Sequence, residues 1–384
     1  MFFILKRRNP IAKFYQWRRM TLPPRGDSSM SYLRIEKEDL HMNALLSKTA
    51  RCIFTLVLVC VSARAPLAQT KATRIVNAAN AFLSTLDQKQ RQSVLFAYDD
   101  EKQRARWSNL PTTMVPRSGL TLRELNPAQR SAALALLSSV LSPKGFQKVQ
   151  EIIEADELLK VDERSKAMFG KDLYYISILG TPSAKDPWMI QFGGHHLGLN
   201  VTIAGERGIL TPTLTGAQPA LYTINGKTIR PLGRESDKAI ALLNALDESQ
   251  QKQAVLSSRM ADLVLGPGQD GKTIQPEGLK ASAMTERQRE MLLDVISEWA
   301  GIVQDSSATP RMAEIKADMK DTWFMWSGPT TVTPGSNITA YYRIQGPHLV
   351  IEYAPQQLGG NPALHVHTMY RDPTNDYGRR PAAK

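Results

Sequence analysis

The chain has 384 residues, of which 42% are hydrophobic and 22% charged, a composition typical of a globular protein with one or two domains. Its formal net charge of +12 is concentrated near the N-terminus, because residues 1–68 carry 12 Lys/Arg but only 4 Asp/Glu. The rest of the chain holds 36 of the 48 basic and 32 of the 36 acidic residues, without a basic stripe with interleaved aromatic side chains. We therefore expect no nucleic-acid partner.

A signal peptide placed late in the chain explains this asymmetry. Basic Lys48 and Arg51 precede an apolar run, Cys52 to Val61, that is short for a membrane-spanning helix. Two small-residue cleavage sites follow, Ala63-Arg64-Ala65 and Pro66-Leu67-Ala68. The pattern predicts an exported protein, periplasmic or secreted, with no stable membrane span after cleavage; an uncleaved membrane anchor is the alternative.

The predicted processing removes every cysteine. We expect residues 42–68 to be the signal peptide and residues 1–41 to come from an upstream start codon, because a signal peptide does not begin 41 residues into a chain. Cys52 and Cys60, the two cysteines, both lie in this segment. Any metal site in the mature protein must therefore use His, Asp or Glu.

Residues 69–384 are predicted to form a single domain with an internal repeat. In the first half, Asn126-Pro127 and Ser142-Pro143 each predict the start of a helix, and a β-rich stretch follows. In the second half, Thr285 and Gln288 have the spacing of a capping box, and a β-rich stretch again follows. Helices followed by strands, twice, indicate an α+β fold of two pseudo-repeated halves, each with a mainly antiparallel β region, packed as one globular unit. The halves span about 75–232 and 236–378.

The two β-rich stretches can be aligned without gaps, "MIQFGGHHLGLNVTI" on "YYRIQGPHLVIEYAP", so that His196 matches His348. Treated as strands, Gln191–Val201 and Arg343–Tyr353 place leucines on one face and polar residues on the other. His196 then lies on a polar face, whereas His195 lies on the leucine face, where a hydrogen-bonded core residue is the ordinary interpretation.

His365 and His367 form a His-x-His pair in "LHVHTMYRDP". On a strand such a pair places two imidazoles on one face, about 7 Å apart, within reach of one metal ion. His196 as a third nitrogen and the carboxylate of Glu352 would complete a ligand set. A polar cluster that joins two sheet layers is the alternative.

The chain resembles the domain of unknown function numbered 3500, a family of mostly exported proteins. The resemblance covers roughly Ile75 to Gly378 and rests on the run from Phe96 to Ile153 and on "FGGHHLGLNVTI", "LTPTLTGAQPA", "YYRIQGPHLVIEY" and "HVHTMYRDPTNDYG". It implies that the family's polar positions recur here as His195, His196, Glu352, His365, His367, Arg371 and Asp372. His348 departs from the family pattern, and the loop "PQQLGGNPALH" is longer than its family counterpart.

Two functions are compatible with these residues. The first is an exported metal-dependent hydrolase or lyase in which His196, His365 and His367 bind Zn²⁺ or another divalent ion. Its predicted catalytic residues are Glu352, Arg371 and Asp372. Glu352 would be the fourth ligand or the general base, and Arg371 would bind an anionic substrate group. The second is a non-catalytic ligand-binding or structural module whose histidines form a hydrogen-bonded polar core. Neither interpretation identifies the substrate.

Overall fold

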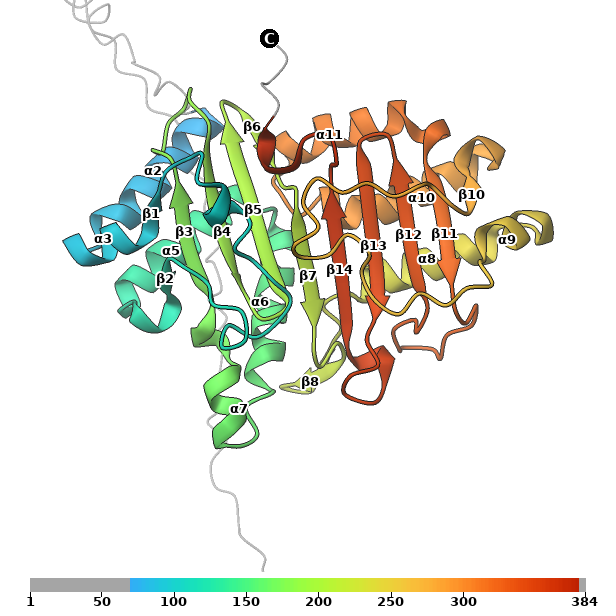
Figure 1. Ribbon diagram of the computed structural model, residues 1–384, viewed down its shortest axis with the longest axis horizontal. Helices are drawn as coiled ribbons and strands as arrows, with labels where there is room; N and C mark the ends of the chain where they lie inside the picture. The colour runs from blue at the N-terminus through green and yellow to red at the C-terminus, as the bar shows by residue number, and fades with distance from the viewer. Residues whose placement is uncertain (1–69, 380–384) are drawn as a thin grey trace, which may run out of the picture. The chain divides into compact units, whose positions relative to one another are not determined.

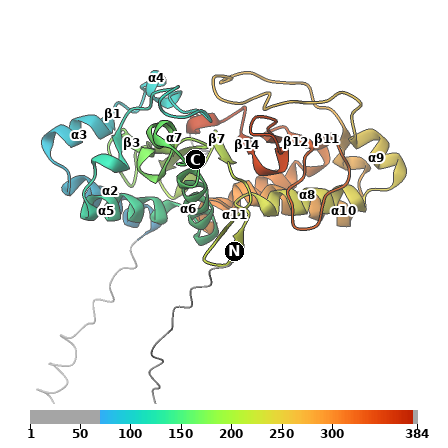
Figure 2. The same ribbon diagram turned by 90° about the horizontal axis from the view of Figure 1, so that it is seen from below.

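The computed structural model describes residues 70–379, which form three layers (Figure 1). A large β-sheet lies in the middle, helices cover one face, and long connecting segments cross the other, as Figure 2 shows from below. The predicted upstream segment (1–41) and signal peptide (42–68) lie outside the described residues. Within residues 70–379, no helix combines the length and apolar character that a bilayer span requires.

Helices in the first part of the chain begin at the polar caps that the sequence predicted. The Asn126 side chain accepts a hydrogen bond from the backbone N–H of Gln129, and Pro127 occupies the first helical position. Ser142 caps the next helix in the same way. The helices of this part are α2 (Lys71–Ser84), α3 (Gln88–Val94), α4 (Glu101–Arg104), α5 (Pro127–Val140), α6 (Pro143–Glu157) and α7 (Glu163–Met168).

A second set of helices follows after residue 230. The capping box of Thr285 and Gln288 is confirmed, since each side chain accepts a hydrogen bond from the other residue's backbone N–H. It starts α10, which packs against α8 and α11. The helices of this part are α8 (Gly233–Ala245), α9 (Glu248–Ala254), α10 (Glu286–Ala300) and α11 (Asp305–Ala317).

All but two of the described strands belong to one sheet, in the order β1-β3-β4-β5-β7-β14-β13-β12-β11-β10. Strand β2 adds to β3 and β6 to β5, while β8 and β9 form a separate hairpin. Pairing is antiparallel except between β1 and β3. The strands are β1 (Leu95–Phe96), β2 (Leu120–Thr121), β3 (Tyr175–Leu179), β4 (Trp188–Gly194), β5 (Leu197–Ala204), β6 (Arg207–Ile209), β7 (Thr213–Ala217), β8 (Tyr222–Ile224), β9 (Lys227–Ile229), β10 (Leu279–Lys280), β11 (Trp323–Ser327), β12 (Tyr341–Gly346), β13 (Leu349–Pro355) and β14 (Val366–Arg371).

The two β-rich stretches of the sequence meet where β7 pairs with β14. At the middle of this pairing the hydroxyl oxygens of Thr215 and Thr368 lie 2.7 Å apart, and the Trp299 indole of α10 donates to Thr368 at 3.0 Å. The stretches therefore form one continuous sheet. The predicted mixture of helices with a mainly antiparallel β region is confirmed.

The interpretation of Gln191–Val201 as a single strand is wrong. Strands β4 and β5 form a hairpin, and His195 and His196 are the turn between them. His196 has a φ of 61°, in the left-handed region that tight hairpin turns require. Pro347 and His348 likewise connect β12 to β13. The backbone of the turn therefore sets the direction of the His196 imidazole. Side chains alternate between the two faces of the sheet only from Leu197 onward.

The predicted leucine face is the core. Leu197, Leu199 and Val201 belong to the main cluster of buried side chains, which the helices cover. On the opposite face of the sheet, Trp107 lies over Gly198, where an added Cβ would come within 3.1 Å of its ring. The connecting segments thus pack closely against the sheet, and a side chain at residue 198 would require the Trp107 ring to shift.

We expect Leu349→Asp to lower the free energy of unfolding by roughly 3 kcal/mol or more, because it places an unpaired charge in the core. Leu349 is 2% exposed and belongs to the main cluster. Urea denaturation measures the change. Leu358→Asp, the same substitution at a residue that is 80% exposed, is the control. Equal stability of the two variants would contradict the assigned core.

Candidate metal centre

Three histidines meet where the β4–β5 turn lies beside the beginning of β14. His196 comes from the turn, His367 from β14, and His365 from the residue just before β14. The Nε2 atom of His365 lies 3.0 Å from Nε2 of His196 and 3.2 Å from Nε2 of His367. Nitrogen ligands 2.0–2.1 Å from a tetrahedral metal ion are about 3.3 Å apart. The spacing of the three rings therefore fits one metal ion.

Hydrogen bonds at the other ring nitrogens determine where the lone pairs point. The Nδ1 atom of His365 lies 2.7 Å from the carbonyl oxygen of Leu358, which can only accept, so the proton sits on Nδ1. The Nδ1 atom of His367 faces the Asp262 carboxylate at 3.6 Å, longer than a hydrogen bond, and the negative charge favours a proton on this nitrogen. The Nδ2 atom of Asn109 lies 3.4 Å from this Nδ1, and exchanging the oxygen and nitrogen of the amide, which have the same shape, places an acceptor there instead. Neutral His365 and His367 thus turn Nε2 lone pairs toward each other, and a cation removes their repulsion.

The three imidazoles favour the neutral form that metal binding requires. Burial, together with the neighbouring histidines, lowers the pKa of His196 well below its ordinary value; burial and the neighbouring histidines also lower the pKa of His365, to about 4, although the bond to Leu358 opposes the shift. Burial also lowers the pKa of His367, although Asp262 opposes the shift. The exposed fractions are 2% for His196 and 5% for each of the other two. The cluster is therefore neutral and nearly closed to solvent at pH 7.

His195 lies against the cluster instead of turning away from it. Its ring stacks on that of His196, with 3.6 Å between centroids. Its Nδ1 atom is 2.6 Å from the carboxylate of Asp156, which in turn accepts a hydrogen bond from the backbone N–H of Gly170. His195 is the hydrogen-bonded, buried residue that was predicted, but as part of a turn it contacts His196. Asp156, His195 and His196 form a second group with the spacing of metal ligands.

Two carboxylates at this site, Asp156 and Asp262, were missed by the sequence analysis. Asp156 did have a signal, because it lies on the buried stripe of α6 with Val149 and Ile152. A carboxylate on the helix face that otherwise carries apolar residues is buried, and it needs a hydrogen-bonding partner in the core. Asp262 had no such signal, since the segment around it has no helix or strand.

Glu352 is buried on β13, and both of its carboxylate oxygens have partners. It accepts hydrogen bonds from the backbone N–H groups of Val264 and Leu265, at 2.6 and 2.8 Å, and from the Tyr341 hydroxyl at 2.7 Å. Burial raises its pKa despite these bonds. In this structure Glu352 holds the covering segment, residues 256–278, which crosses the loop-covered face of the sheet and carries Asp262.

Arg371 binds the same segment. Its guanidinium donates to the carbonyl oxygens of Leu265 and Gly266, at 2.7 and 3.0 Å, and to the carboxylates of Asp270 and Asp376, at 2.8 and 2.7 Å. Burial opposes the charge of Arg371, but the two carboxylates raise its pKa, so it remains a cation. This charge is balanced inside the protein.

Asp372 has partners of its own, at a different place from those of Arg371. It forms an ion pair with Arg311 of α11 at 3.1 Å and accepts hydrogen bonds from the backbone N–H and the hydroxyl of Thr374. The structure therefore brings together the three predicted metal ligands and places the three predicted catalytic residues in other contacts. Their catalytic roles stay predictions.

The fold and the site define a mixed α and β protein with a buried group of histidines that could hold a metal ion. The chain belongs to the family described as "Protein of unknown function (DUF3500)", which matches residues 68–379 and so confirms the resemblance seen in the sequence. Comparison with curated proteins and with solved structures gave no match.

The buried imidazoles predict how stability depends on pH. Their pKa values are lower in the folded protein, so the stabilisation is complete above the ordinary histidine pKa of about 6.5 and is lost as pH falls toward about 4. Replacing His365 by Gln removes one such group. In the metal-free protein, urea denaturation at about pH 7 and pH 5 should show a smaller loss of stability for His365→Gln than for the wild type. Equal losses would contradict the neutral cluster.

Proposed function

We propose that the protein binds one divalent metal ion, zinc above all, through His196, His365 and His367, and that the ion serves a hydrolase or lyase reaction. The observation that carries the proposal is the meeting of Nε2 atoms at 3.0 and 3.2 Å, with the proton of His365 held on the far side of its ring and Asp262 favouring the same arrangement in His367. Neutral imidazoles whose lone pairs face one another are stable in a buried site when a cation lies between them.

Three imidazole ligands leave a fourth position for water or substrate. A zinc ion held there would acidify a bound water or polarise a carbonyl group. Asp262 lies beside His367, and its side chain is half exposed, so it has access to both the ligand and the solvent. Burial alone would raise its pKa, but the nearby His367 and hydrogen bonds from the Leu263 N–H and the Gln356 amide outweigh the burial and lower the pKa. It is therefore a carboxylate that can orient His367 and take part in proton transfer at the edge of the site.

Glu352 and Arg371 contribute indirectly under this proposal. Both bind backbone groups of the covering segment, two to four residues beyond Asp262. Hydrogen bonds to charged groups stabilise by about 1.5–3 kcal/mol each, so the segment is firmly held where it passes the site. We infer that Glu352 and Arg371 position Asp262. Asp372 lies away from the histidines, and there it holds Arg311 through their ion pair.

The burial of the cluster favours a second candidate function, a non-catalytic module. Because the three histidine residues are only 2–5% exposed, an ion would be enclosed and would fasten the β4–β5 turn to β14. Structural zinc sites have four protein ligands and no exchangeable position. Asp156 and His195, which stand behind His196, supply further ligand atoms for such a closed site.

We also propose that the two halves of the domain are pseudo-equivalent. Support comes from the element order, because β3-β4-β5-β7 and β11-β12-β13-β14 approach the β7–β14 pairing from opposite sides of the sheet. The two hairpins end in the same register, with Gly194 opposite Leu197 and Gly346 opposite Leu349. His196 and His348 then hold equivalent turn positions.

Export remains part of the proposal. The supporting pattern is the apolar run with its basic start and small-residue cleavage sites in residues 42–68. The mature N-terminus, read by mass spectrometry of the exported protein, should lie near Ala65 to Gln69. Retention of Met42 would contradict the processing.

Metal analysis tests the ligand set. After chelation and reconstitution with zinc, the untagged wild-type protein should hold about one equivalent, and His367→Ala less than about one-tenth, because the loss of one of three ligands removes most of the affinity. His348→Ala, which changes a histidine outside the cluster, should keep the full equivalent. Less than about one-tenth equivalent in the wild type would contradict the proposed function.

The cobalt-substituted protein separates the two candidate functions. An open fourth position predicts that added azide changes the visible absorption of the bound cobalt, since the anion replaces water. A closed structural site predicts an unchanged spectrum and a large fall in melting temperature on chelation.

A further inference from the structure

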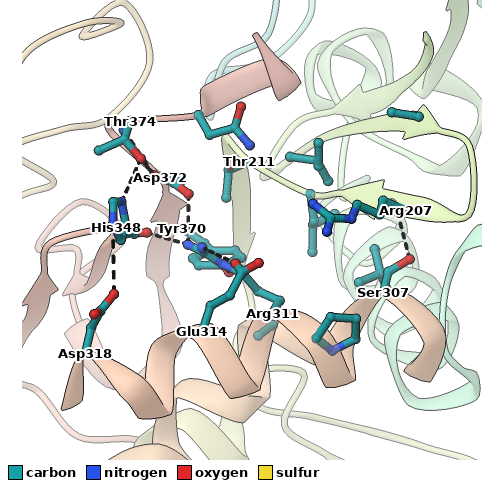
Figure 3. A pocket seen from close by; sticks show the side chains of 18 of the residues that line it. Arg207, Thr211, Ser307, Arg311, Glu314, Asp318, His348, Tyr370, Asp372 and Thr374 are labelled. Carbon is teal, nitrogen blue, oxygen red and sulfur yellow. Dashed lines mark hydrogen bonds and ion pairs between the residues drawn. The ribbon is translucent and has the colours of Figure 1, made fainter. Parts of the chain in front are cut away.

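A second site lies at the far end of β14 from the histidine cluster. A cavity of about 500 Å³ opens between α11, β6 and the residues that follow β14 (Figure 3). Cavities of this size hold small molecules. Apolar residues, among them Ile209, Val303 and Pro310, form part of its lining. The polar residues are arranged unevenly, since Figure 3 shows Arg207 and Ser307 on one side and His348 and Asp318 on the other.

Arg311 stands in the middle of the cavity, but its charge is already used. Its guanidinium contacts the carboxylates of Asp372 at 3.1 Å and Glu314 at 3.3 Å, the Tyr370 hydroxyl at 3.2 Å and the carbonyl oxygen of His348. These partners occupy four of the five N–H donors of the guanidinium, and the two carboxylates balance its charge. Arg311 therefore shapes the cavity and leaves the recognition of charged groups to the two sides.

The side formed by His348 and Asp318 offers hydrogen-bond acceptors. The Thr374 hydroxyl donates to Asp372 at 2.6 Å, so toward His348 Nδ1, 2.9 Å away, it accepts, and the imidazole proton sits on Nδ1. The Nε2 atom of His348 then presents a lone pair, 3.9 Å from the carboxylate of Asp318. A lone pair and a carboxylate side by side favour a ligand group with several donors and a positive charge, as an ammonium group has.

The side formed by Arg207 and Ser307 has the opposite character. Within residues 70–379, the Arg207 side chain has no hydrogen bond or ion pair. Ser307 accepts the backbone N–H of Gly208 at 2.8 Å, which leaves its hydroxyl proton free to donate. A guanidinium next to a hydroxyl donor is suited to a carboxylate, which it can bind through two hydrogen bonds.

We propose that this cavity binds a short amino carboxylate with an apolar body, such as a dipeptide with two aliphatic side chains. The ammonium group would bind His348 and Asp318, the carboxylate would bind Arg207 and Ser307, and the aliphatic groups would cover Ile209 and its apolar neighbours. The site needs no metal ion and is separate from the histidine cluster.

Isothermal titration calorimetry with leucyl-leucine tests the proposal. The wild-type protein should bind the dipeptide with a Kd below about 1 mM, and both the N-acetyl derivative and the C-terminal amide should bind at least about tenfold more weakly. Binding should be the same after removal of metal by a chelator, which distinguishes this site from the proposed metal centre. Absence of saturable binding by leucyl-leucine would overturn the proposal.

Two variants locate the ends of the ligand. Arg207→Gln should weaken binding of the dipeptide about tenfold but should leave binding of the C-terminal amide unchanged. Asp318→Asn should likewise weaken binding of the dipeptide about tenfold but should leave binding of the N-acetyl derivative unchanged. Arg123→Gln, which changes an exposed arginine outside the cavity, is the control and should have no effect. Unchanged dipeptide binding in both Arg207→Gln and Asp318→Asn would overturn the assignment of the cavity.

Discussion

The pairing of β7 with β14 is the constraint on which the candidate metal centre depends. It joins two β-rich stretches into one sheet and sets His367 opposite Gly216, whose backbone N–H donates to the carbonyl oxygen of His196 at 2.7 Å. A Cβ at residue 216 would lie 3.2 Å from the His367 ring and 3.3 Å from Cβ of His196, so the absence of a side chain there gives both histidines room. Long-range strand pairing thus creates a ligand set from distant parts of the chain.

Both faces of the sheet bury charged groups, but in different surroundings. The helix-covered face is a large apolar core that encloses the Lys148–Glu235 ion pair, whereas the face crossed by the connecting segments buries Glu352 and Arg371. A buried charge without a partner costs several kcal/mol, and here backbone groups and carboxylates supply the partners. The covering segment is consequently fixed in one position although it has little regular secondary structure, and Asp262 is fixed with it. A polar, well-ordered face of this kind is suited to holding a metal site.

Local signals in the sequence were sufficient for much of the fold. Asn126, Ser142 and Thr285 mark real helix starts because a cap needs only the neighbouring residues. The His-x-His spacing predicted that His365 and His367 share a site because a strand fixes that geometry. The turn at His195 and His196 was missed, since glycine before a histidine pair fits a strand and a hairpin equally well. Asp156 and Asp262 required knowledge of tertiary contacts, because no local pattern brings them to the histidines.

X-ray absorption spectroscopy of the zinc-loaded wild-type protein tests the central claim most directly, because it reads the ligands around the ion itself. Three imidazole nitrogens at about 2.0–2.1 Å, completed by one further oxygen or nitrogen ligand, are the predicted first coordination sphere. The His367→Ala protein should lose the three-imidazole signature. Zinc surrounded only by oxygen ligands, or a spectrum that is the same in both proteins, would contradict the account.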